Sequence, residues 1–293
     1  MSAEQIKQRI LELTPDVKPS SLKTFVSNLF NLYKNNEGSG DLEWFLETDK
    51  ILNIIADRPL SSQKNIVASI LRIFPEEQIY RDTMYQLGEQ IKETLATNQK
   101  TEKQEAGWKS PEELKTIYDD LLKKAKPILN SKTPLEGRAL AEVSDFVLFA
   151  ISSGLFMPPR RSTDIMELKI RDYDVNTDNY IHRGYFVFNK YKTADVYGKT
   201  KLAIPKGLKP ILSKYIKLNP HTHLLVNNSG APLTQPRITQ KLNDIIGSKT
   251  STSMLRHIYL SSVYKDTPAL EDLNQIAKDM GHSVATAMEY AKK

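Results

Sequence analysis

The chain has 293 residues, of which 40% are hydrophobic and 26% charged, a composition typical of a globular protein with one large domain or two modest ones. It contains no cysteine, which excludes disulfide bridges, thiolate zinc sites and cysteine nucleophiles and fits a reducing, intracellular environment. No run of about 18 apolar residues is present, so no membrane span is expected, and the polar, amphipathic first residues argue against a secretory signal.

The net charge of +6 is distributed unevenly along the chain. Residues 1–97 carry 11 Lys and Arg against 14 Asp and Glu, whereas the remaining residues carry 30 against 21. A basic second part indicates a polyanionic partner such as nucleic acid, because neutralisation of phosphates drives such binding. A well-solvated basic surface would have the same charge, so charge alone leaves both interpretations open.

The first hundred residues have the apolar spacing of helices throughout. Three- and four-residue steps recur in three stretches, at Ile6, Ile10 and Leu13, at Phe25, Leu29 and Leu32, and at Ile66, Ile70 and Phe74. We expect Ser20-Ser21 and Ser61-Ser62 to cap helix starts and Pro75 to end a helix. The pattern predicts about four or five short helices packed together.

A polar segment with almost no apolar residue follows, from Thr97 to Gly107, and is typical of a linker. We place the domain boundary near Lys103, which gives domains of residues 1–103 and 104–293. Ser110-Pro111 then predicts a helix start, with serine as the cap, proline in the first turn and two acidic residues near the positive end of the helix dipole.

The second domain is expected to be mostly helical with one small antiparallel sheet, so the predicted fold class is mainly α (α+β). A strongly apolar helix around residues 140–150 should be central. Short β-prone runs follow at residues 185–188 and 202–204, separated by a turn that carries several lysines and Gly198. Helical spacing returns from Leu208 onward.

Two adjacent arginines follow a double proline at the end of the apolar helix. Arg160 and Arg161 carry guanidinium groups, which bind phosphate through two parallel hydrogen bonds and remain charged at any working pH. Asp164 lies about one helical turn past Arg161 and could orient its guanidinium or neutralise it. An exposed loop arginine pair would have the same local sequence.

Two further segments carry cations. Lys190 and Lys192 lie in the expected turn, where a lysine can reach a phosphate, give a proton to a leaving oxygen, or simply protect a strand edge. Arg256 lies near the start of a helix, where its charge opposes the helix dipole unless an anion is close by.

The last segment runs from Met280 to Tyr290. Gly281 suits the end of one helix, and Ser283 can cap the next, short helix that carries Tyr290. His282 lies in this tight connection, where it can donate to a phosphate oxygen or to a carbonyl.

The order and spacing of these four segments resemble the catalytic domain of tyrosine recombinases, including phage-type integrases. Residues 161–172 resemble the first arginine box of that family, and Lys192-Thr193 with the strand after it resembles the lysine turn. Residues 254–257 resemble the second arginine box and residues 280–283 the glycine–histidine box. The resemblance extends from about Lys109 to Tyr290, and a helical N-terminal DNA-clamping domain also fits, although residues 1–103 carry no specific motif.

The resemblance implies a site-specific recombinase or integrase that cuts and rejoins double-stranded DNA through a covalent 3′-phosphotyrosyl intermediate. It implies catalytic roles for Arg161, Lys192, Arg256, His282 and Tyr290, assistance from Ser253, His257 and Asp164, and DNA contacts from Arg160, Lys190 and Lys241. It also implies self-association on DNA as a tetramer, a viral or mobile-element setting, and no metal, nucleotide or other cofactor.

Two positions depart from the family's pattern. Ser253 stands where the family usually has histidine, and a hydroxyl is a poor proton acceptor near neutral pH. His282 and Tyr290 are eight positions apart where nine is typical, and one residue on a helix is a rotation of about 100°. Tyr264, which precedes the histidine box, is the alternative nucleophile.

Two other functions fit the same residues. A monomeric type IB topoisomerase shares this active-site chemistry but relaxes supercoils without exchanging strands between sites. A DNA-binding protein that keeps the fold without catalysis is the other alternative, and the departures at Ser253 and Tyr290 make it worth testing. A metal site at His221 and His223 is not expected, because no acidic or cysteine cluster supports it.

Overall fold

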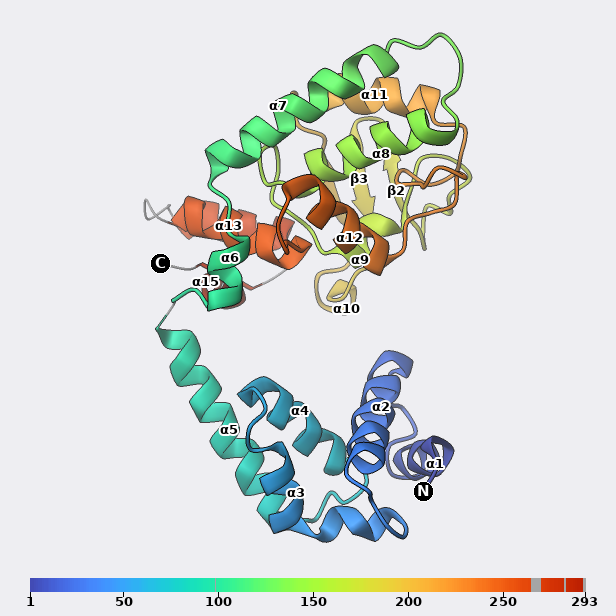
Figure 1. The fold of residues 1–293 in the computed structure, drawn as a ribbon. Coiled ribbons are helices and arrows are strands. Elements are labelled where there is room, and N and C mark those ends of the chain that lie inside the picture. Colours follow the sequence, from blue (N-terminus) through green and yellow to red (C-terminus); the bar gives the residue numbers. More distant parts are fainter. Residues whose placement is uncertain (98, 265–269, 282, 292–293) are drawn as a thin grey trace. The chain divides into compact units, whose positions relative to one another are not determined.

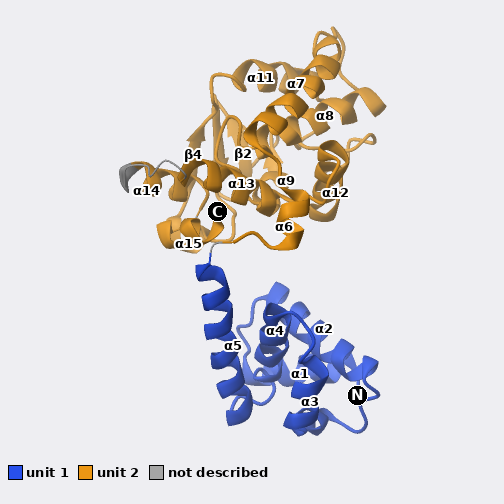
Figure 2. Cartoon of the chain, turned by 60° about the vertical axis from the view of Figure 1, so that its left-hand side comes forward, with its two compact units in different colours: residues 1–97 blue, residues 98–293 orange. Residues whose placement is uncertain are grey.

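A computed structural model describes residues 1–97, 99–264, 270–281 and 283–291, with only the backbone described for residues 270 and 271. Within these ranges no helix is long and apolar enough to cross a membrane. The chain divides into two compact units, Met1–Thr97 and Asn98–Lys293, which Figure 2 shows in separate colours. The division precedes Lys103, where the composition of the linker suggests the boundary.

Unit 1 is helical, as its apolar spacing predicts. Its elements are α1 (Ala3–Leu13), α2 (Pro19–Asn35), the 3-10 helix η1 (Leu42–Leu46), α3 (Thr48–Ile55), α4 (Leu60–Ile70) and α5 (Gln78–Ala96) (Figure 1). Their apolar faces form one core, in which the Tyr80 hydroxyl donates to the Phe45 carbonyl at 2.6 Å.

The starts of two helices in unit 1 differ from the expectation. α2 begins at Pro19 and α4 follows Pro59, and neither expected serine pair caps its helix. Proline already has the φ that a helix start requires, so Pro19 begins α2 without a side-chain cap, while Pro59 is the residue just before α4. α5 spans 19 residues and is longer than the short helices that the sequence suggests.

The expected linker contains a helix, α6 (Glu102–Gly107). Thr101 and Gln104 form a reciprocal capping box at its start. The residues of a capping box are polar, so their composition is the same as that of a linker. At its end Gly107 is buried, and its carbonyl accepts a hydrogen bond from the Thr250 hydroxyl at 3.1 Å. A Cβ at Gly107 would lie 2.8 Å from the Lys249 carbonyl oxygen, so only glycine allows this close approach. Residues 102–107 therefore belong to unit 2.

Besides α6 and a short helix between two strands of the sheet, the described part of unit 2 contains eight helices. They are α7 (Pro111–Ile128), α8 (Gly137–Ser152), α9 (Ser162–Met166), α11 (Lys209–Leu218), α12 (Gln235–Ile246), α13 (Thr252–Tyr264), α14 (Leu270–Asp279) and α15 (Val284–Tyr290). The predicted start of α7 is confirmed, because the Ser110 side chain accepts from the Glu113 amide and Pro111 occupies the first turn.

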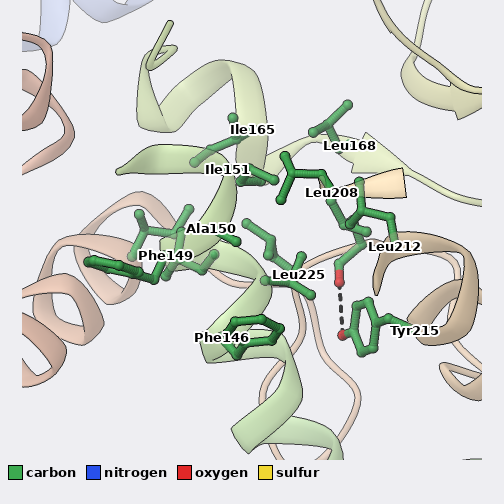
Figure 3. Close-up of a cluster of buried hydrophobic side chains, with 14 of the residues drawn as sticks. Phe146, Phe149, Ala150, Ile151, Ile165, Leu168, Leu208, Leu212, Tyr215 and Leu225 are labelled. Carbon is green, nitrogen blue, oxygen red and sulfur yellow. Dashed lines mark hydrogen bonds between the residues drawn. The ribbon is translucent and has the colours of Figure 1, made fainter. Parts of the chain in front are cut away.

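The predicted central position of α8 is confirmed. α7 and α12 pack against it, and nearly all of its residues from Phe146 onward are buried. Figure 3 shows Phe146 and Phe149 of α8 in the same cluster as Leu212 and Tyr215 of α11. The Tyr215 hydroxyl donates to the Leu224 carbonyl at 2.9 Å, so this buried polar group is satisfied.

The sheet of unit 2 has four strands in the order β1-β2-β3-β4. They are β1 (Leu168–Lys169), β2 (Asn179–His182), β3 (Tyr185–Phe188) and β4 (Thr200–Ala203), with the short helix α10 (Ala194–Tyr197) between β3 and β4. The β-prone runs correspond to β3 and β4, while β1 and β2 were not predicted.

The expectation of an antiparallel sheet is wrong at one edge. β2–β3 and β3–β4 are antiparallel, but β1 pairs with β2 in parallel, so the sheet is mixed. β2 and β3 are joined by the two-residue turn Arg183-Gly184, in which both residues have positive φ, as tight hairpins require. β1 has only two residues, and a strand that short carries no periodicity that the sequence could reveal.

We expect Phe146→Ala to lower the free energy of unfolding of unit 2 by about 3–5 kcal/mol, because it leaves a cavity in the cluster around α8. Chemical denaturation followed by circular dichroism measures the change. Val196→Ala is the matched control, since Val196 is 75% exposed and its truncation should change stability by less than about 0.5 kcal/mol. Equal effects of the two variants would contradict the central position of α8.

Candidate active site

Three segments of unit 2 bring a cation or a hydroxyl to one place. Arg161 lies at the start of α9, Arg256 in the second turn of α13, and Tyr290 at the end of α15. α13 and α15 pack against each other, and Tyr290 adjoins the small core formed by Leu260 and Ala287. Arg256 and Tyr290, which are 34 positions apart in sequence, meet because α13 and α15 pack against each other, and the charge of Arg161 acts on Arg256 from the start of α9.

The two adjacent arginines have different surroundings. Arg160 is 1% exposed, and its Nε and Nη2 atoms each lie 3.1 Å from Oδ2 of Asp164. Its guanidinium also lies over the rings of Phe188 and Tyr191, 4.1 and 4.9 Å from their centroids. Burial lowers the pKa of Arg160, and the adjacent Asp164 carboxylate opposes that shift.

These contacts differ from two expectations. Asp164 pairs with Arg160 and not with Arg161, although its backbone amide does bond to the Arg161 carbonyl at 3.0 Å. Arg160 was expected to contact DNA, and its guanidinium binds the Asp164 carboxylate and the Asp279 carbonyl within the unit. The sequence missed this because neighbouring residues at a helix start can point to opposite sides of the backbone.

Arg161 is the less buried of the pair. Its Nη1 atom is inaccessible to solvent and makes no hydrogen bond to the described part of the chain. A buried guanidinium nitrogen normally has an acceptor, so this one is suited to an acceptor supplied by a ligand.

Arg256 is 1% exposed, and its Nη1 lies 3.4 Å from the Tyr290 hydroxyl. The guanidinium also lies over the Tyr290 ring, 4.6 Å from its centroid. Burial lowers the pKa of Arg256; Tyr290 opposes this shift, and the positive charge of Arg161 adds to it. Arginine still remains charged at working pH, so two guanidinium charges lie close enough to repel, and an anion near both would be stabilised.

The short helix α15 begins as the sequence predicts. Gly281 has φ +68° at the end of the preceding helix, and the Ser283 hydroxyl accepts from the Thr286 amide at 3.2 Å. With these turns the eight-residue spacing brings the Tyr290 hydroxyl beside Arg256. His282, the fourth predicted catalytic residue, lies outside the described residues.

His257 also contacts Tyr290. Its Nδ1 lies 2.7 Å from the main-chain oxygen of Tyr290, and the two rings stack with centroids 4.6 Å apart. Because a carbonyl only accepts, Nδ1 must carry the proton of this bond. His257 therefore orients both the backbone and the ring of Tyr290.

The alternative nucleophile, Tyr264, has a buried hydroxyl, and burial raises its pKa. A phenol that is shielded from solvent and slow to ionise is a poor nucleophile. Tyr290 has the more suitable surroundings of the two.

The remaining predicted residues lie near the surface. Lys190, Lys192 and Ser253 have exposed side chains, the first two between β3 and α10 and the third in the first turn of α13. Lys241 was expected to contact DNA, and its Nζ lies 2.6 Å from Oδ2 of Asp145 in an ion pair within the unit.

Thr193 was named from the sequence only as part of the lysine turn, with no role of its own. Its hydroxyl donates to the Gly281 carbonyl at 2.9 Å, which connects the lysine turn to the segment before α15. The two residues are 88 positions apart, and no local pattern indicates such a contact.

Solved structures share this fold, whereas no family model and no curated protein matches the sequence. A lambda integrase dimer bound to a COC′ core site matches with a TM-score of 0.57 and 16% identity, over 97% of this chain and 92% of that chain. The Tn1549 transposon integrase in complex with transposon right end DNA matches with a TM-score of 0.56 and 15% identity, over 100% and 95%. A lambda integrase tetramer bound to a Holliday junction gives a TM-score of 0.56 and 15% identity, over 99% and 76%. The chain has the tyrosine recombinase fold.

We expect Asp164→Asn to lower the free energy of unfolding of unit 2 by about 3–5 kcal/mol, because it leaves the buried Arg160 charge without a counter-ion. Asp119→Asn is the matched control, since Asp119 pairs with Lys115 on the exposed surface of α7 and such pairs contribute about 0–1 kcal/mol. Denaturant titration of both variants checks this. A mild effect of Asp164→Asn would mean that Arg160 does not depend on this carboxylate.

Proposed function

We propose that the protein is a site-specific DNA recombinase that cuts and rejoins DNA through a covalent bond between Tyr290 and a 3′ phosphate. The observation that carries the proposal is the Tyr290 hydroxyl 3.4 Å from Nη1 of the buried Arg256, with Arg161 adding a second positive charge. The tyrosine recombinase fold supports it, because the similar structures are integrases solved with DNA.

In the proposed reaction the Tyr290 oxygen attacks a DNA phosphorus and gives its proton to solvent water as the new O–P bond forms. The bond from phosphorus to the 5′ oxygen breaks, and Lys192 gives that oxygen a proton, so a free 5′ hydroxyl leaves. Arg161 and Arg256 bind the non-bridging oxygens and stabilise the charge that develops on them. His282, by resemblance, donates to the same phosphate.

Rejoining is the reverse step with another strand. A 5′ hydroxyl of the partner DNA attacks the phosphotyrosyl phosphorus and gives its proton to Lys192. The bond from phosphorus to the Tyr290 oxygen breaks, and that oxygen takes a proton from solvent water. Because the phosphotyrosyl bond keeps the energy of the phosphodiester, the exchange needs no nucleoside triphosphate.

Double-stranded DNA is the proposed partner, and the basic residues of unit 2 support it. This unit carries the +9 excess of charge, and the side chains of Lys190 and Lys192 are exposed. In unit 1, α2 and the start of α4 form a groove with amide, hydroxyl and guanidinium groups, which suit phosphate and sugar oxygens: Asn28, Asn31, Arg58, Ser62 and Asn65. We propose that unit 1, residues 1–97, clamps the DNA.

Assembly on DNA as a tetramer is part of the proposal, since strand exchange requires protomers on two paired sites. The lambda integrase tetramer on a Holliday junction is the similar structure that supports it. A type IB topoisomerase would instead relax supercoiled plasmid as a monomer and leave two labelled sites unexchanged. Relaxation without exchange would therefore favour the topoisomerase.

A covalent adduct tests the reaction. Labelled nicked duplexes, including the ends of the element that encodes the protein, should give an adduct that survives SDS with the unmodified protein and not with Tyr290→Phe. Tyr264→Phe is the matched control and should keep the adduct. Adduct in Tyr290→Phe would move the nucleophile elsewhere, and DNA binding without adduct in any variant would favour a non-catalytic DNA-binding protein.

Tyr290 and Arg256 belong to one chain, so we expect each protomer to cleave with its own tyrosine. Arg256→Gln should lower the cleavage rate about 100–1000-fold, as loss of one charge-stabilising donor does. An equimolar mixture of Arg256→Gln and Tyr290→Phe should remain as slow as Arg256→Gln alone. Recovery of cleavage in the mixture, measured as adduct per labelled strand, would mean that the tyrosine comes from a neighbouring protomer.

A further inference from the structure

We propose that Arg160 and Thr193 are positioning residues that set the place of Tyr290 by holding the connection between α14 and α15. The inference rests on the proposed role of Tyr290 as nucleophile. Both hold the backbone from Asp279 to Gly281, which precedes α15 in the chain.

Arg160 holds the first part of this connection. Its Nη1 donates to the Asp279 carbonyl at 2.7 Å, at the last residue of α14. The last carbonyls of a helix have no partner within the helix and lie at the negative end of its dipole, so a guanidinium there both satisfies and attracts them. Asp164 and two aromatic rings fix the guanidinium, so the bonded carbonyl is fixed as well.

Thr193 holds the second part, through its 2.9 Å hydrogen bond to the Gly281 carbonyl. Gly281 lies close against the same group of side chains. A Cβ built on it would lie 3.3 Å from Tyr191, 3.4 Å from the Thr193 hydroxyl and 3.5 Å from Arg160 Nη2. The turn therefore rests on the face formed by Arg160, Tyr191 and Thr193.

The chain order gives these contacts a consequence for catalysis. Arg160 precedes Arg161, and Thr193 follows Lys192, so the backbone that presents two proposed catalytic cations also holds the base of the nucleophile's helix. α15 has only seven residues, too few to keep its own position without tertiary contacts. A displacement of about 1 Å in a reacting group can slow a reaction about 100-fold.

Thr193→Val is the sharpest variant, because it keeps the shape of the side chain and removes only the hydroxyl. The Thr193 side chain makes no capping bond to α10, so its loss should spare that helix. We expect cleavage of nicked DNA at saturating protein to slow about 10–100-fold, with unchanged DNA affinity and melting temperature, and Thr193→Ser to restore the rate. Unchanged cleavage in Thr193→Val would overturn the proposal.

A modified substrate separates Tyr290 from the neighbouring Lys192. With sulfur in place of the 5′ bridging oxygen, the leaving thiolate needs no proton, so Lys192→Ala should regain its rate. Thr193→Val should stay slow on this substrate. If the sulfur substrate restores Thr193→Val, the residue acts through Lys192, and its role in placing Tyr290 is overturned.

Hydrogen exchange gives a readout that does not depend on activity. In Thr193→Val and Arg160→Lys the amides of residues 284–290 should exchange faster than in the unmodified protein, while those of unit 1 and of Thr193→Ser should not change. Unchanged exchange in α15 would overturn the positioning role whatever the cleavage rate. Faster exchange together with no adduct in the unmodified protein would instead overturn the recombinase function and leave the anchoring of α15 in place.

Discussion

The burial of a guanidinium is the constraint on which unit 2 depends. A buried charge is stable only where an opposite charge, ring faces and acceptors replace water. Arg160 obtains all of these from its own chain: Asp164, the rings of Phe188 and Tyr191, and the Asp279 carbonyl. These partners belong to α9, β3, the turn after it and α14, so satisfying one side chain aligns the sheet with α14.

Arg256 is buried to the same extent but has different neighbouring groups. Its guanidinium lies against Tyr290, and Arg161 contributes a second positive charge nearby. An excess of positive charge inside a protein is stabilised when an anion binds, and a DNA phosphate is the anion that the proposed reaction brings. Asp164 therefore offsets the charge of Arg160 within the fold, and Arg161 with Arg256 forms the pair that we propose binds a DNA phosphate.

The elements whose signals involve only residues close together in sequence were predicted correctly. The apolar period around Phe146 gave the central helix, Ser110 gave the start of α7, and Gly281 with Ser283 gave the break before α15. Each depends on steric or hydrogen-bonding rules within about one or two helical turns. α6 was missed because a capping box has the polar composition of a linker, and β1 because two residues carry no period.

The sequence by itself determined which residues are available for chemistry: two arginine segments, a lysine turn and a tyrosine near the end, in the order of a tyrosine recombinase. Only the tertiary structure decided which of these residues contact one another. It paired Asp164 with Arg160 rather than Arg161, joined Thr193 to Gly281, and brought Tyr290 rather than Tyr264 to Arg256. The partners of Arg160 and Thr193 lie 119 and 88 positions away, and contacts across such separations depend on how helices and sheet pack, which no local spacing records.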